Sequence, residues 1–521
     1  MAQINNLSKN YFSNKKILLV GLGILGGGLA TALWFLKQKV KLTITDLKSK
    51  EYLQKSIQKL KKYNKQIKYV LGKHRFFDFK NNEIIIVNPA VKTLDNPYLN
   101  YAKKLKKTIE NDLSFLFKFT TNPKICITGT RGKTTTTNWV YFFIKNKEKN
   151  ALIGGNIPEY PIFSLIEKIK NNEPIILESS CFQLELFNNR PKIAVITSLY
   201  QDHLNRYKKM ETYAKIKAQI FLNQLSEDYL VLNYNNKWTK FFLSLKPKSK
   251  IYFFSLKTPS KKNFQGIFVK NNKVYFRDKG KEVFILNIKN FKKQWGEHNV
   301  SNLLCAILVA YLYGLSFEEI KKQIPKLPQI KMRQEKIFEN KKLKIINDSA
   351  GTSPEAAIAA LERFKKEKKN LILICGGTDK NLNFDDRGFL VEVLKKTDPI
   401  FKEIKQTTYT ETYPGVIKAF HWHKRQLDFW FVIKGMAQVV LYDLREDSPT
   451  KGETNVFYLG EKNLAVLVIP PGVAHGYRVL GNQPVGLLYQ TTEIYNPENP
   501  DEGRISFDDK KIGFDWTTRP R

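Results

Sequence analysis

The sequence has few cysteines and no long apolar run. Its four cysteines lie singly and far apart, which excludes a paired-cysteine metal site and a disulfide framework, and we predict reduced thiols at Cys126, Cys181, Cys305 and Cys375. No stretch of about 18 uncharged apolar residues is present, so a membrane-spanning helix is not expected. The first residues, MAQINNLSKN, lack the basic start and apolar stretch of a secretory signal, and we therefore expect a cytoplasmic protein.

Acidic residues are scarce in the first three quarters of the chain. Residues 1–384 carry 69 Lys and Arg against 29 Asp and Glu, whereas residues 385–521 carry 18 and 19. The net charge of +39 therefore arises upstream of residue 385, mostly from lysines in helix-like stretches such as KSKEYLQKSIQKLKKYNK. Because these lysines form no recognisable nucleic-acid-binding motif, we expect a solvated lysine-rich surface that attracts phosphorylated small substrates, and no nucleic-acid partner.

The order of the expected elements divides the 521 residues into four parts. Strand and helix patterns alternate up to about residue 384, and short alternating strands follow, as in DFWFVIKGMAQVVLYDLR. We predict an α/β multidomain chain with a Rossmann-like domain (1–121), a P-loop-type ATP-binding domain (122–328) and an incomplete third α/β domain (329–384). An all-β cupin or jelly-roll barrel (385–521) completes it.

A glycine turn follows the first expected strand. KKILLV leads into GLGILGGG, where Gly21, Gly23 and Gly26 match GxGxxG, and Asp46 follows about 20 positions later at the end of VKLTITD. Read alone, this pattern is typical of a dinucleotide-binding dehydrogenase. That interpretation needs a catalytic His or Lys site, which we do not identify.

A second glycine turn joins a buried strand to a helix in KICITGTRGKTTTTNWVYFFI. Gly129 and Gly132 let the backbone approach an anion, and the helix that follows offers free N–H groups. Lys133 can then reach a terminal phosphate, and the hydroxyl of Thr134 can bind Mg²⁺. The spacing GxxGK[ST] is shorter than the general P-loop pattern.

Five further motifs accompany this loop: GGNIP (154–158), LESSCFQLE (177–185), YQDHLNRYKKMETYAKIKAQIF (200–221), GEHNVSN (296–302) and NDSAGT (347–352). With them, residues 15–384 resemble the Mur ligase family, in particular its D-glutamate-adding type. The resemblance assigns the first glycine turn to a UDP-linked substrate instead of a dinucleotide.

The resemblance implies a role for each site residue. ATP would be bound by Gly129, Thr130, Gly132, Lys133, Thr134, Thr135, Asn299, Asn302 and Arg333. Magnesium would be bound by Thr134, Glu178, His203 and Lys217, the last after carbamylation. The UDP substrate would be bound by Gly21, Gly23, Gly26, Asp46 and Asn156. From the residues alone, His203 could instead be a core histidine, Lys217 a solvated lysine, and Asn299 and Asn302 helix caps.

The implied reaction joins D-glutamate to UDP-N-acetylmuramoyl-L-alanine in peptidoglycan synthesis. ATP phosphorylates the substrate carboxylate, and the amine then attacks the acyl phosphate to form an amide. The sequence departs from the family in two places: the third domain stops after GGTDKNLNF, and Ala350 stands at the position of the family's lysine, while Thr352 is retained. The shortened sheet is predicted to expose apolar surface. The alternative is an inactive ligase part that binds nucleotide and carries an active cupin.

Residues 385–521 resemble the dTDP-4-dehydrorhamnose 3,5-epimerase family through GVIKAFHWHK, YDLREDSPT, IPPGVAHGY and FDDKKIGFDW. The resemblance implies a dTDP-4-keto-sugar as substrate, a dimer through the cupin, and proton transfer by His421, Asp509 and Tyr489. Lys418 stands where the family has an arginine, and Asp428 stands where it has a substrate-binding lysine.

Two other interpretations of the cupin stay open. Gly415, His421, His423, Asp428 and Gly435 fit the metal-cupin pattern GX₅HXHX₄EX₆G with Asp for Glu, and His475 follows PxG as a fourth ligand. Imidazoles with a carboxylate suit Fe, Mn, Ni or Zn. The remaining possibility is an inactive sugar-binding barrel.

Overall fold

The computed structural model describes residues 12, 15–24, 26–170, 172–261, 263–340, 343–351, 354–364, 373, 383–385, 388–391, 393–396, 398 and 400–517. The chain forms two compact units, Met1–Glu335 and Lys336–Arg521. Three of the predicted thiols, Cys126, Cys181 and Cys305, are buried and free, whereas Cys375 lies outside the described residues. No helix in the described part of the chain has the length and hydropathy to cross a lipid bilayer.

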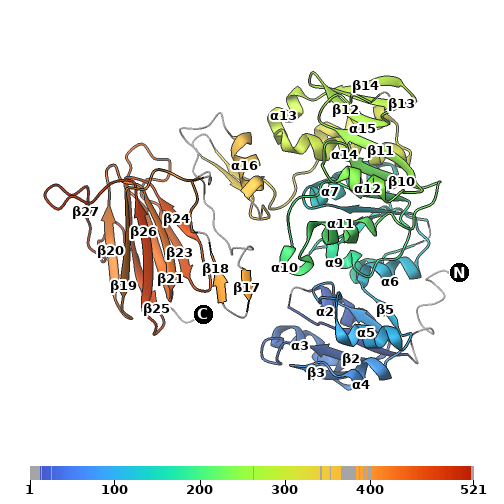
Figure 1. The fold of residues 1–521 in the computed structure, drawn as a ribbon, viewed down its shortest axis with the longest axis horizontal. Helices are drawn as coiled ribbons and strands as arrows, with labels where there is room; N and C mark the ends of the chain where they lie inside the picture. Colours follow the sequence, from blue (N-terminus) through green and yellow to red (C-terminus); the bar gives the residue numbers. More distant parts are fainter. Residues whose placement is uncertain are drawn as a thin grey trace. The chain divides into compact units, whose positions relative to one another are not determined.

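The first unit begins with a parallel sheet, which in the described residues has five strands in the order β3-β2-β1-β4-β5 (Figure 1). Neighbouring residues of β1 point into different cores: Ile17 and Leu19 into one, Leu18 and Val20 into the other. Burial of both faces explains why the strand is apolar throughout. The strands are β1 Lys16–Val20, β2 Lys41–Asp46, β3 Ile67–Leu71, β4 Ile84–Val87 and β5 Thr108–Glu110. The helices are α2 Gly27–Lys37, α3 Gln54–Leu60, α4 Phe76–Asn81, α5 Pro97–Lys104 and α6 Asp112–Phe119.

A second sheet follows, with the order β14-β13-β12-β11-β10-β9-β6-β8-β7 among the described residues. Its strands from β12 to β7 are parallel, and β13 and β14 are antiparallel additions. The strands are β6 Lys124–Thr128, β7 Leu152–Gly155, β8 Ile175–Glu178, β9 Ile193–Ile196, β10 Tyr229–Asn233, β11 Lys250–Ser255, β12 Gly266–Lys270, β13 Lys273–Asp278 and β14 Lys281–Asn287.

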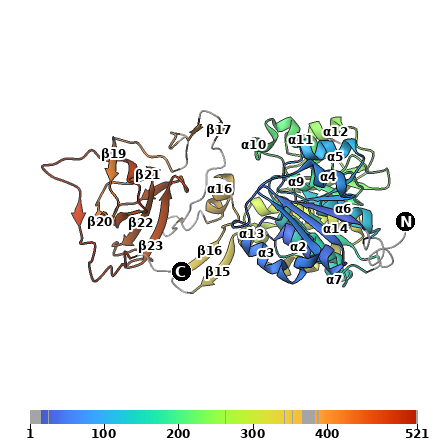
Figure 2. The same ribbon diagram turned by 90° about the horizontal axis from the view of Figure 1, so that it is seen from below.

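In the view from below, the blue strands of the first sheet lie in front (Figure 2). The second sheet packs against helices. They are α7 Lys133–Lys147, α8 Ile162–Ile166, α9 Cys181–Leu184, α10 Leu204–Tyr207, α11 Met210–Ala218, α12 Thr239–Ser244, α13 Lys289–Trp295, α14 His298–Tyr313 and α15 Phe317–Gln323. Eight consecutive residues of α14, 303–310, are buried, as expected for a helix inside the core. The predicted α/β architecture is confirmed.

The chain order places a binding edge beside β6. From β6 the chain passes to the edge strand β7, returns to β8, and then crosses to β9 on the other side of β6. In open parallel sheets, ligands bind at the carboxyl ends of strands where the order reverses in this way. The phosphate loop, Glu178 and the segment after β9 all lie at this edge.

The second unit begins with the short third α/β segment. Strands β15 Glu335–Glu339 and β16 Lys344–Asn347 pair, and α16 Pro354–Arg363 follows. The predicted strand KLKIIND corresponds to β16, whereas NLILICGG lies outside the described residues except for Leu373, and Thr352 also lies outside them. Ile337 is 56% exposed, and Phe338 and Ile345 are also exposed. The predicted apolar surface is therefore present on this segment.

The rest of the second unit is all-β, as predicted. A hairpin of β17 Asn383–Asp385 and β18 Gly388–Leu390 precedes two antiparallel sheets, which within the described residues have the orders β19-β26-β21-β24 and β23-β22-β25-β20-β27. The sheets remain open and do not close into the expected barrel. The strands are β19 Gln406–Thr412, β20 Ile417–Trp422, β21 Asp428–Lys434, β22 Met436–Asp443, β23 Thr454–Gly460, β24 Val466–Ile469, β25 Val473–Leu480, β26 Val485–Thr491 and β27 Gly503–Arg504.

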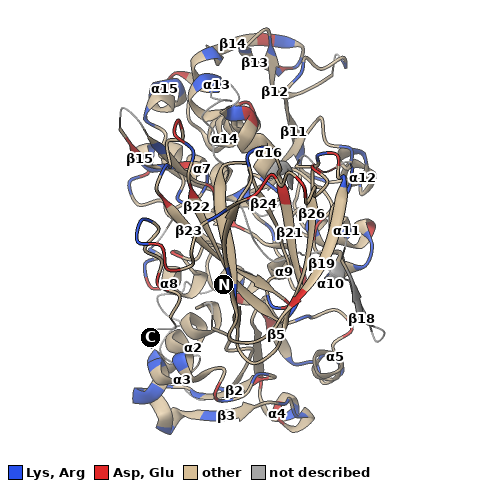
Figure 3. Ribbon diagram, turned by 90° about the vertical axis from the view of Figure 1, so that its left-hand side faces the viewer, with Lys and Arg blue, Asp and Glu red and all other residues tan. Residues whose placement is uncertain are grey.

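The basic residues of the first unit are spread over many elements. Figure 3 shows Lys and Arg on α3, α13 and α15, among others. This distribution agrees with a solvated lysine-rich surface.

Candidate nucleotide and metal sites

The phosphate loop is built on two glycines that accept no side chain. Gly129 and Gly132 have positive φ angles of 151° and 82°. A Cβ on Gly132 would lie 2.3 Å from Oδ1 of Asn302, and one on Gly129 would lie 2.0 Å from Oγ1 of Thr197. The loop can therefore adopt this path only with glycine at both positions.

Residues after β9 hold the loop in place. The N–H of Thr130 donates to the carbonyl oxygen of Ser198 at 2.7 Å, and the N–H of Arg131 donates to the Ser198 hydroxyl at 3.2 Å. The hydroxyl of Thr197 donates to the carbonyl oxygen of Arg131. Sequence reasoning missed Thr197 and Ser198, although their place directly after the buried strand IAVI was a usable signal.

Helix α7 starts at Lys133, directly after the loop. The first N–H groups of a helix have no partner within the helix and carry a partial positive charge, so they attract anions. The Nζ of Lys133 donates to the carbonyl oxygen of Thr130 at 3.2 Å and so lies over the loop. Thr135 is buried, and Thr134 is half-buried at the start of the helix. This end of α7 can bind a phosphate group.

Helix α14 brings two asparagines to the same loop. Asn302 has its Oδ1 beside Gly132, and its Nδ2 donates to Oδ1 of Asn299 at 2.9 Å. Asn299 in turn donates to the carbonyl oxygen of Trp295 at 2.9 Å. Arg333 is exposed and lies in the segment that leads from α15 to β15. Asn302 thus contacts the loop directly and Asn299 supports it.

Glu178 ends β8 with its side chain buried at 2% exposure. Its Oε1 accepts a hydrogen bond from Nδ2 of Asn156 at 3.1 Å, and its Oε2 is buried without a hydrogen-bond partner among the described residues. A buried carboxylate oxygen without a partner is costly unless a cation compensates it. The site therefore fits a hard cation such as Mg²⁺, which prefers oxygen ligands.

Lys217 lies inside the same region, at 1% exposure. Its Nζ donates to the carbonyl oxygen of Gly129 at 3.0 Å and to the hydroxyl of Thr128 at 3.3 Å. The pKa of the Lys217 amine is lowered to about 8, mainly by burial; the charge of Lys133 also lowers it, whereas Cys181, Asp202 and Glu178 act in the opposite direction. The amine of Lys217 therefore lies within electrostatic reach of both Lys133 and Glu178.

His203 lies at the start of α10 with a left-handed backbone, φ 54°. Its ring centroid is 4.8 Å from that of Phe182 and 6.2 Å from that of Tyr213, and its Nε2 is 3.5 Å from Oδ2 of Asp202. Tyr213 also reaches the phosphate loop, since its hydroxyl is 3.3 Å from that of Thr130. His203 is thus linked to the loop through Tyr213, and its side chain is half-buried instead of enclosed in the core.

A buried ion pair positions the segment that carries His203. The guanidinium of Arg206 donates two hydrogen bonds of 2.7 Å to the carboxylate of Glu185, whose side chain is fully buried. Arg206 also donates to the carbonyl oxygen of Val91 at 2.8 Å, and Thr93 donates to Glu185. The pair therefore joins the second sheet's domain to the loop after β4 in the first.

The first glycine turn is closed by its own aspartate. Asp46 accepts hydrogen bonds from the N–H groups of Leu22 at 2.8 Å and Gly23 at 3.1 Å. A Cβ on Gly28 would lie 2.3 Å from the carbonyl oxygen of Leu22, so this glycine, which the motif analysis did not single out, is needed for the turn. Gly21, Gly23 and Gly26 all have positive φ angles. The turn has the predicted shape, with Asp46 supporting its backbone.

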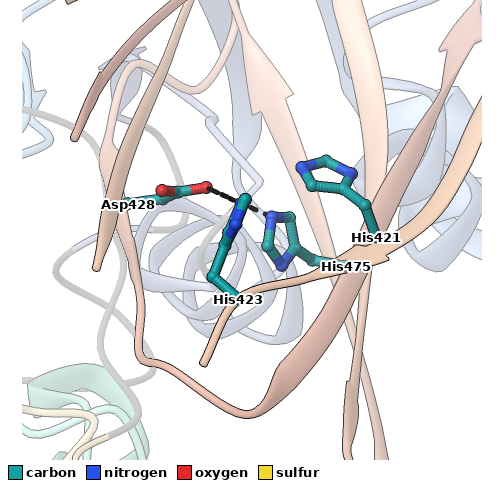
Figure 4. A group of neighbouring side chains, drawn as sticks. All are labelled: His421, His423, Asp428 and His475. Carbon is teal, nitrogen blue, oxygen red and sulfur yellow. Dashed lines mark ion pairs between the residues drawn. The ribbon is translucent and has the colours of Figure 1, made fainter. Parts of the chain in front are cut away.

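Four polar side chains meet between the strands of the second unit: His421, His423, Asp428 and His475 (Figure 4). Their ligand atoms all lie within 4.8 Å of one another. The Oδ2 of Asp428 is 3.2 Å from Nε2 of His475 and 3.6 Å from Nε2 of His423. Burial lowers the pKa of His421 to about 2, helped by His475 and His423.

Strand pairing explains how these residues meet. His421 on β20 is directly opposite His475 on β25, after a register shift between Lys418 and His421. Trp430 on β21 stacks on His421 at a centroid distance of 5.9 Å, and Tyr489 on β26 pairs with Trp430 across the sheet. Cross-strand partners project to the same face, so Tyr489 lies on the face of the histidines.

Asp509 has a different setting. Its Oδ1 accepts hydrogen bonds from the N–H groups of Lys511 at 2.8 Å and Ile512 at 3.2 Å, which closes a turn. The carboxylate that contacts the imidazoles is that of Asp428.

Comparison with known proteins finds three family models that match successive parts of the chain. The family model "Mur ligase MurD-like, N-terminal domain" matches residues 15–110, "Mur ligase middle domain" matches residues 127–310, and "dTDP-4-dehydrorhamnose 3,5-epimerase" matches residues 377–521. UDP-N-acetylmuramoylalanine–D-glutamate ligase of Borreliella burgdorferi is 34% identical over 372 residues, 71% of this chain and 79% of the relative. The ligase of the same name from Clostridioides difficile is 35% identical over 374 residues, 71% of this chain and 80% of the relative. The spore coat polysaccharide biosynthesis protein SpsL of Bacillus subtilis is 56% identical over 137 residues, 26% of this chain and 91% of the relative.

Proposed function

The chain belongs to the Mur ligase family, with a C-terminal part of the dTDP-4-dehydrorhamnose 3,5-epimerase family, and we propose that it joins D-glutamate to UDP-N-acetylmuramoyl-L-alanine at the expense of ATP. The observation that carries the proposal is the pocket at the carboxyl edge of the second sheet. There the phosphate loop, the unpartnered Oε2 of Glu178 and the buried amine of Lys217 lie together. This is the arrangement that a phosphate donor and a cation require.

The residues of this pocket have different roles. The N–H groups at the start of α7 and the ammonium of Lys133 bind the terminal phosphates of ATP and offset their charge. Asn302 fixes the loop from the side of α14. The substrate carboxylate becomes an acyl phosphate, and the amine of D-glutamate displaces the phosphate to form the amide. Because no covalent enzyme intermediate is needed, the residues act by positioning and by charge.

Magnesium would be held by the carboxylate of Glu178, the hydroxyl of Thr134 and the imidazole of His203. Bound there, the ion neutralises phosphate charge. We also propose that Lys217 is carbamylated: its neutral amine adds CO₂ and releases one proton, which gives a carboxylate-like group near Glu178. A buried amine of lowered pKa supports this step, because only the neutral form reacts with CO₂.

The first domain would bind the UDP part of the substrate at its glycine turn. Gly21, Gly23 and Gly26 let the backbone approach the diphosphate, and α2 starts directly after them. Asp46 would act there by holding the turn, through its hydrogen bonds to Leu22 and Gly23. Asn156 would reach the muramoyl part from its place beside Glu178.

Mass spectrometry tests the proposal directly. The full-length protein is incubated with ATP, Mg²⁺, UDP-N-acetylmuramoyl-L-alanine and either D- or L-glutamate. We expect a product heavier by one glutamate residue with the D-enantiomer alone. About a fifth of the Borreliella burgdorferi relative lies outside the match. ATP binding without product would therefore show that residues missing from the third segment are required, and would favour the carrier interpretation.

For the C-terminal part we propose a nucleotide-linked keto sugar as ligand, in line with the name of its family. Proton transfer by His421, Tyr489 and Asp509 stays a prediction, and Tyr489 has the position that supports it best. The measurement is deuterium uptake from heavy water into a dTDP-4-keto-sugar. The dimer through the cupin also stays a prediction, which light scattering of the full chain tests.

A further inference from the structure

The four polar side chains between β20, β21 and β25 have no role in the ligase proposal. His421, His423, Asp428 and His475 come from three strands and a connecting loop, and their ligand atoms lie within 4.8 Å of one another (Figure 4). The Asp428 and His475 side chains are each only 2% exposed. Polar groups buried so deeply need partners. Gln426 and the carbonyl oxygens of Val473 and Asp501 supply some of them, and the remaining polar atoms of the cluster face one another.

The hydrogen bonds around the cluster fix the orientation of two imidazoles. The Nδ1 of His475 is 2.9 Å from the carbonyl oxygen of Val473, and the Nδ1 of His423 contacts the carbonyl oxygen of Asp501. Because a carbonyl oxygen only accepts, each Nδ1 carries the proton. In neutral rings both Nε2 atoms then present lone pairs toward Asp428, and that of His423 also accepts from Nε2 of Gln426 at 3.1 Å.

These lone pairs face a carboxylate oxygen. The Nε2 of His475 is buried and lies 3.2 Å from Oδ2 of Asp428, which makes an ion pair if the ring is protonated and a contact of two acceptors if it is neutral. Two acceptor atoms at this distance repel unless a positive charge lies between them or beside both. The other oxygen of Asp428, Oδ1, accepts from Nε2 of Gln426 at 2.7 Å, which holds the carboxylate in this orientation.

We propose that His421, His423, Asp428 and His475 bind a divalent transition-metal ion. Three imidazole nitrogens and one carboxylate oxygen are a donor set for Fe, Mn, Ni, Co or Zn, whereas Mg²⁺ and Ca²⁺ prefer oxygen alone. The hydrogen bonds to Val473 and Asp501 are the outer contacts that orient metal-bound histidines. The site is independent of the ligase pocket, whose ligands belong to the other unit.

Metal binding changes the role of His421. An imidazole nitrogen that is bound to a metal has no lone pair with which to remove a proton from a sugar. The metal site and a general base at that nitrogen therefore exclude each other, and any chemistry at this site would proceed at the remaining coordination positions.

Cobalt titration of the full-length, tag-free protein tests the proposal. After removal of metals with a chelator, Co²⁺ alone is added and its visible absorption is followed. We expect about one equivalent with the intense bands of nitrogen-ligated cobalt, and at least about tenfold weaker binding in Asp428→Asn and His423→Gln. His74→Gln removes one imidazole from the first unit, and Glu178→Gln removes the candidate magnesium ligand; both should leave the bands unchanged.

Two further measurements test the proposal without relying on the fold of the Asp428 and His423 variants. The unfolding temperature of the wild type should rise on addition of Co²⁺, since the ion binds the folded state. Echo-modulation EPR of Mn²⁺ bound to His203→Gln, which lacks the imidazole of the candidate magnesium site, should show imidazole nitrogen. The proposal is overturned if the wild type gives no nitrogen-ligated cobalt bands and His203→Gln gives no nitrogen modulation. Bands that disappear in Glu178→Gln and persist in Asp428→Asn also overturn it, because the ion then binds in the first unit.

Discussion

The amine nitrogen of Lys217 lies 3.0 Å from the carbonyl oxygen of Gly129, the first residue of the phosphate loop. This hydrogen bond joins α11 to the loop and holds a buried amine against the backbone of the phosphate loop. Tyr213, one helical turn before Lys217, reaches Thr130 of the same loop. The two contacts show why the segment that follows β9 and the phosphate loop must be interpreted as one site.

Replacement of Lys217 by alanine should lower the rate of ligation at least about a hundredfold, because the pocket loses its proposed carbamate. Lys215→Ala is the matched control: Lys215 lies on the same helix, is 61% exposed and pairs with the exposed Glu211. Its activity should stay within a factor of two. If short carboxylates such as acetate partly restore Lys217→Ala, the carbamate is supported; equal loss in both variants would contradict the assignment.

Glu178→Gln separates catalysis from stability. The substitution keeps an oxygen acceptor for Asn156 and removes a buried charge whose Oε2 has no hydrogen-bond partner in the described residues. Without magnesium, we expect the free energy of unfolding to stay equal or to rise by about 1 kcal/mol, while ligation is lost. Thermal unfolding with and without Mg²⁺ and nucleotide measures both effects. A large loss of stability in Glu178→Gln would show that the carboxylate has a structural partner instead.

Gly132→Ala tests the close contact in the phosphate loop. Gly132 and Gly280 both have a φ angle of 82°, but a Cβ on Gly132 would lie 2.3 Å from Asn302, whereas one on Gly280 would have open space within 4 Å. Gly280→Ala should cost about 1 kcal/mol for its backbone angle alone, and Gly132→Ala should cost more. ATP affinity, measured by calorimetry, should fall in Gly132→Ala and not in Gly280→Ala. Equal affinities would remove the loop from the nucleotide site.

The buried pair of Arg206 and Glu185 should be sensitive to loss of one partner. Arg206→Ala leaves the carboxylate of Glu185 buried without its guanidinium, at an expected cost of about 3–5 kcal/mol. Adding Glu185→Gln removes the stranded charge and should recover part of that loss. Urea unfolding of the single and double variants measures this. The account is contradicted if the double variant is less stable than Arg206→Ala.

The sequence predicted the parts of the site that depend on local order. The apolar strand KICIT, the glycine turn and the following helix are contiguous in the sequence. The strand, the loop and the start of α7 could therefore be placed without a structure. Glu178 and Lys217 could be assigned only through their motifs, since nothing local distinguishes Lys217 from the other lysines. Only the structure shows that its amine is buried against Gly129.

Contacts between distant segments were not predictable in the same way. Thr197 and Ser198 hold the phosphate loop because β9 lies beside β6, which is a property of the strand order. In the second unit, Asp428 meets His475 because two sheets face each other, and spacing along the chain could not decide between Asp428 and Asp509 as the carboxylate beside the imidazoles. Whether the sheets close into a barrel likewise depends on which strands pair, and the order of strands along the chain does not determine this.

If the residues around Lys133, Glu178 and Lys217 couple ATP to amide formation, phosphate is released from ATP only as the amide forms. Phosphate release by the full-length protein is therefore measured with each substrate omitted in turn. We expect release only when UDP-N-acetylmuramoyl-L-alanine and D-glutamate are both present, and none in Lys133→Met. Release that is independent of either substrate, or unchanged in Lys133→Met, would contradict this coupling.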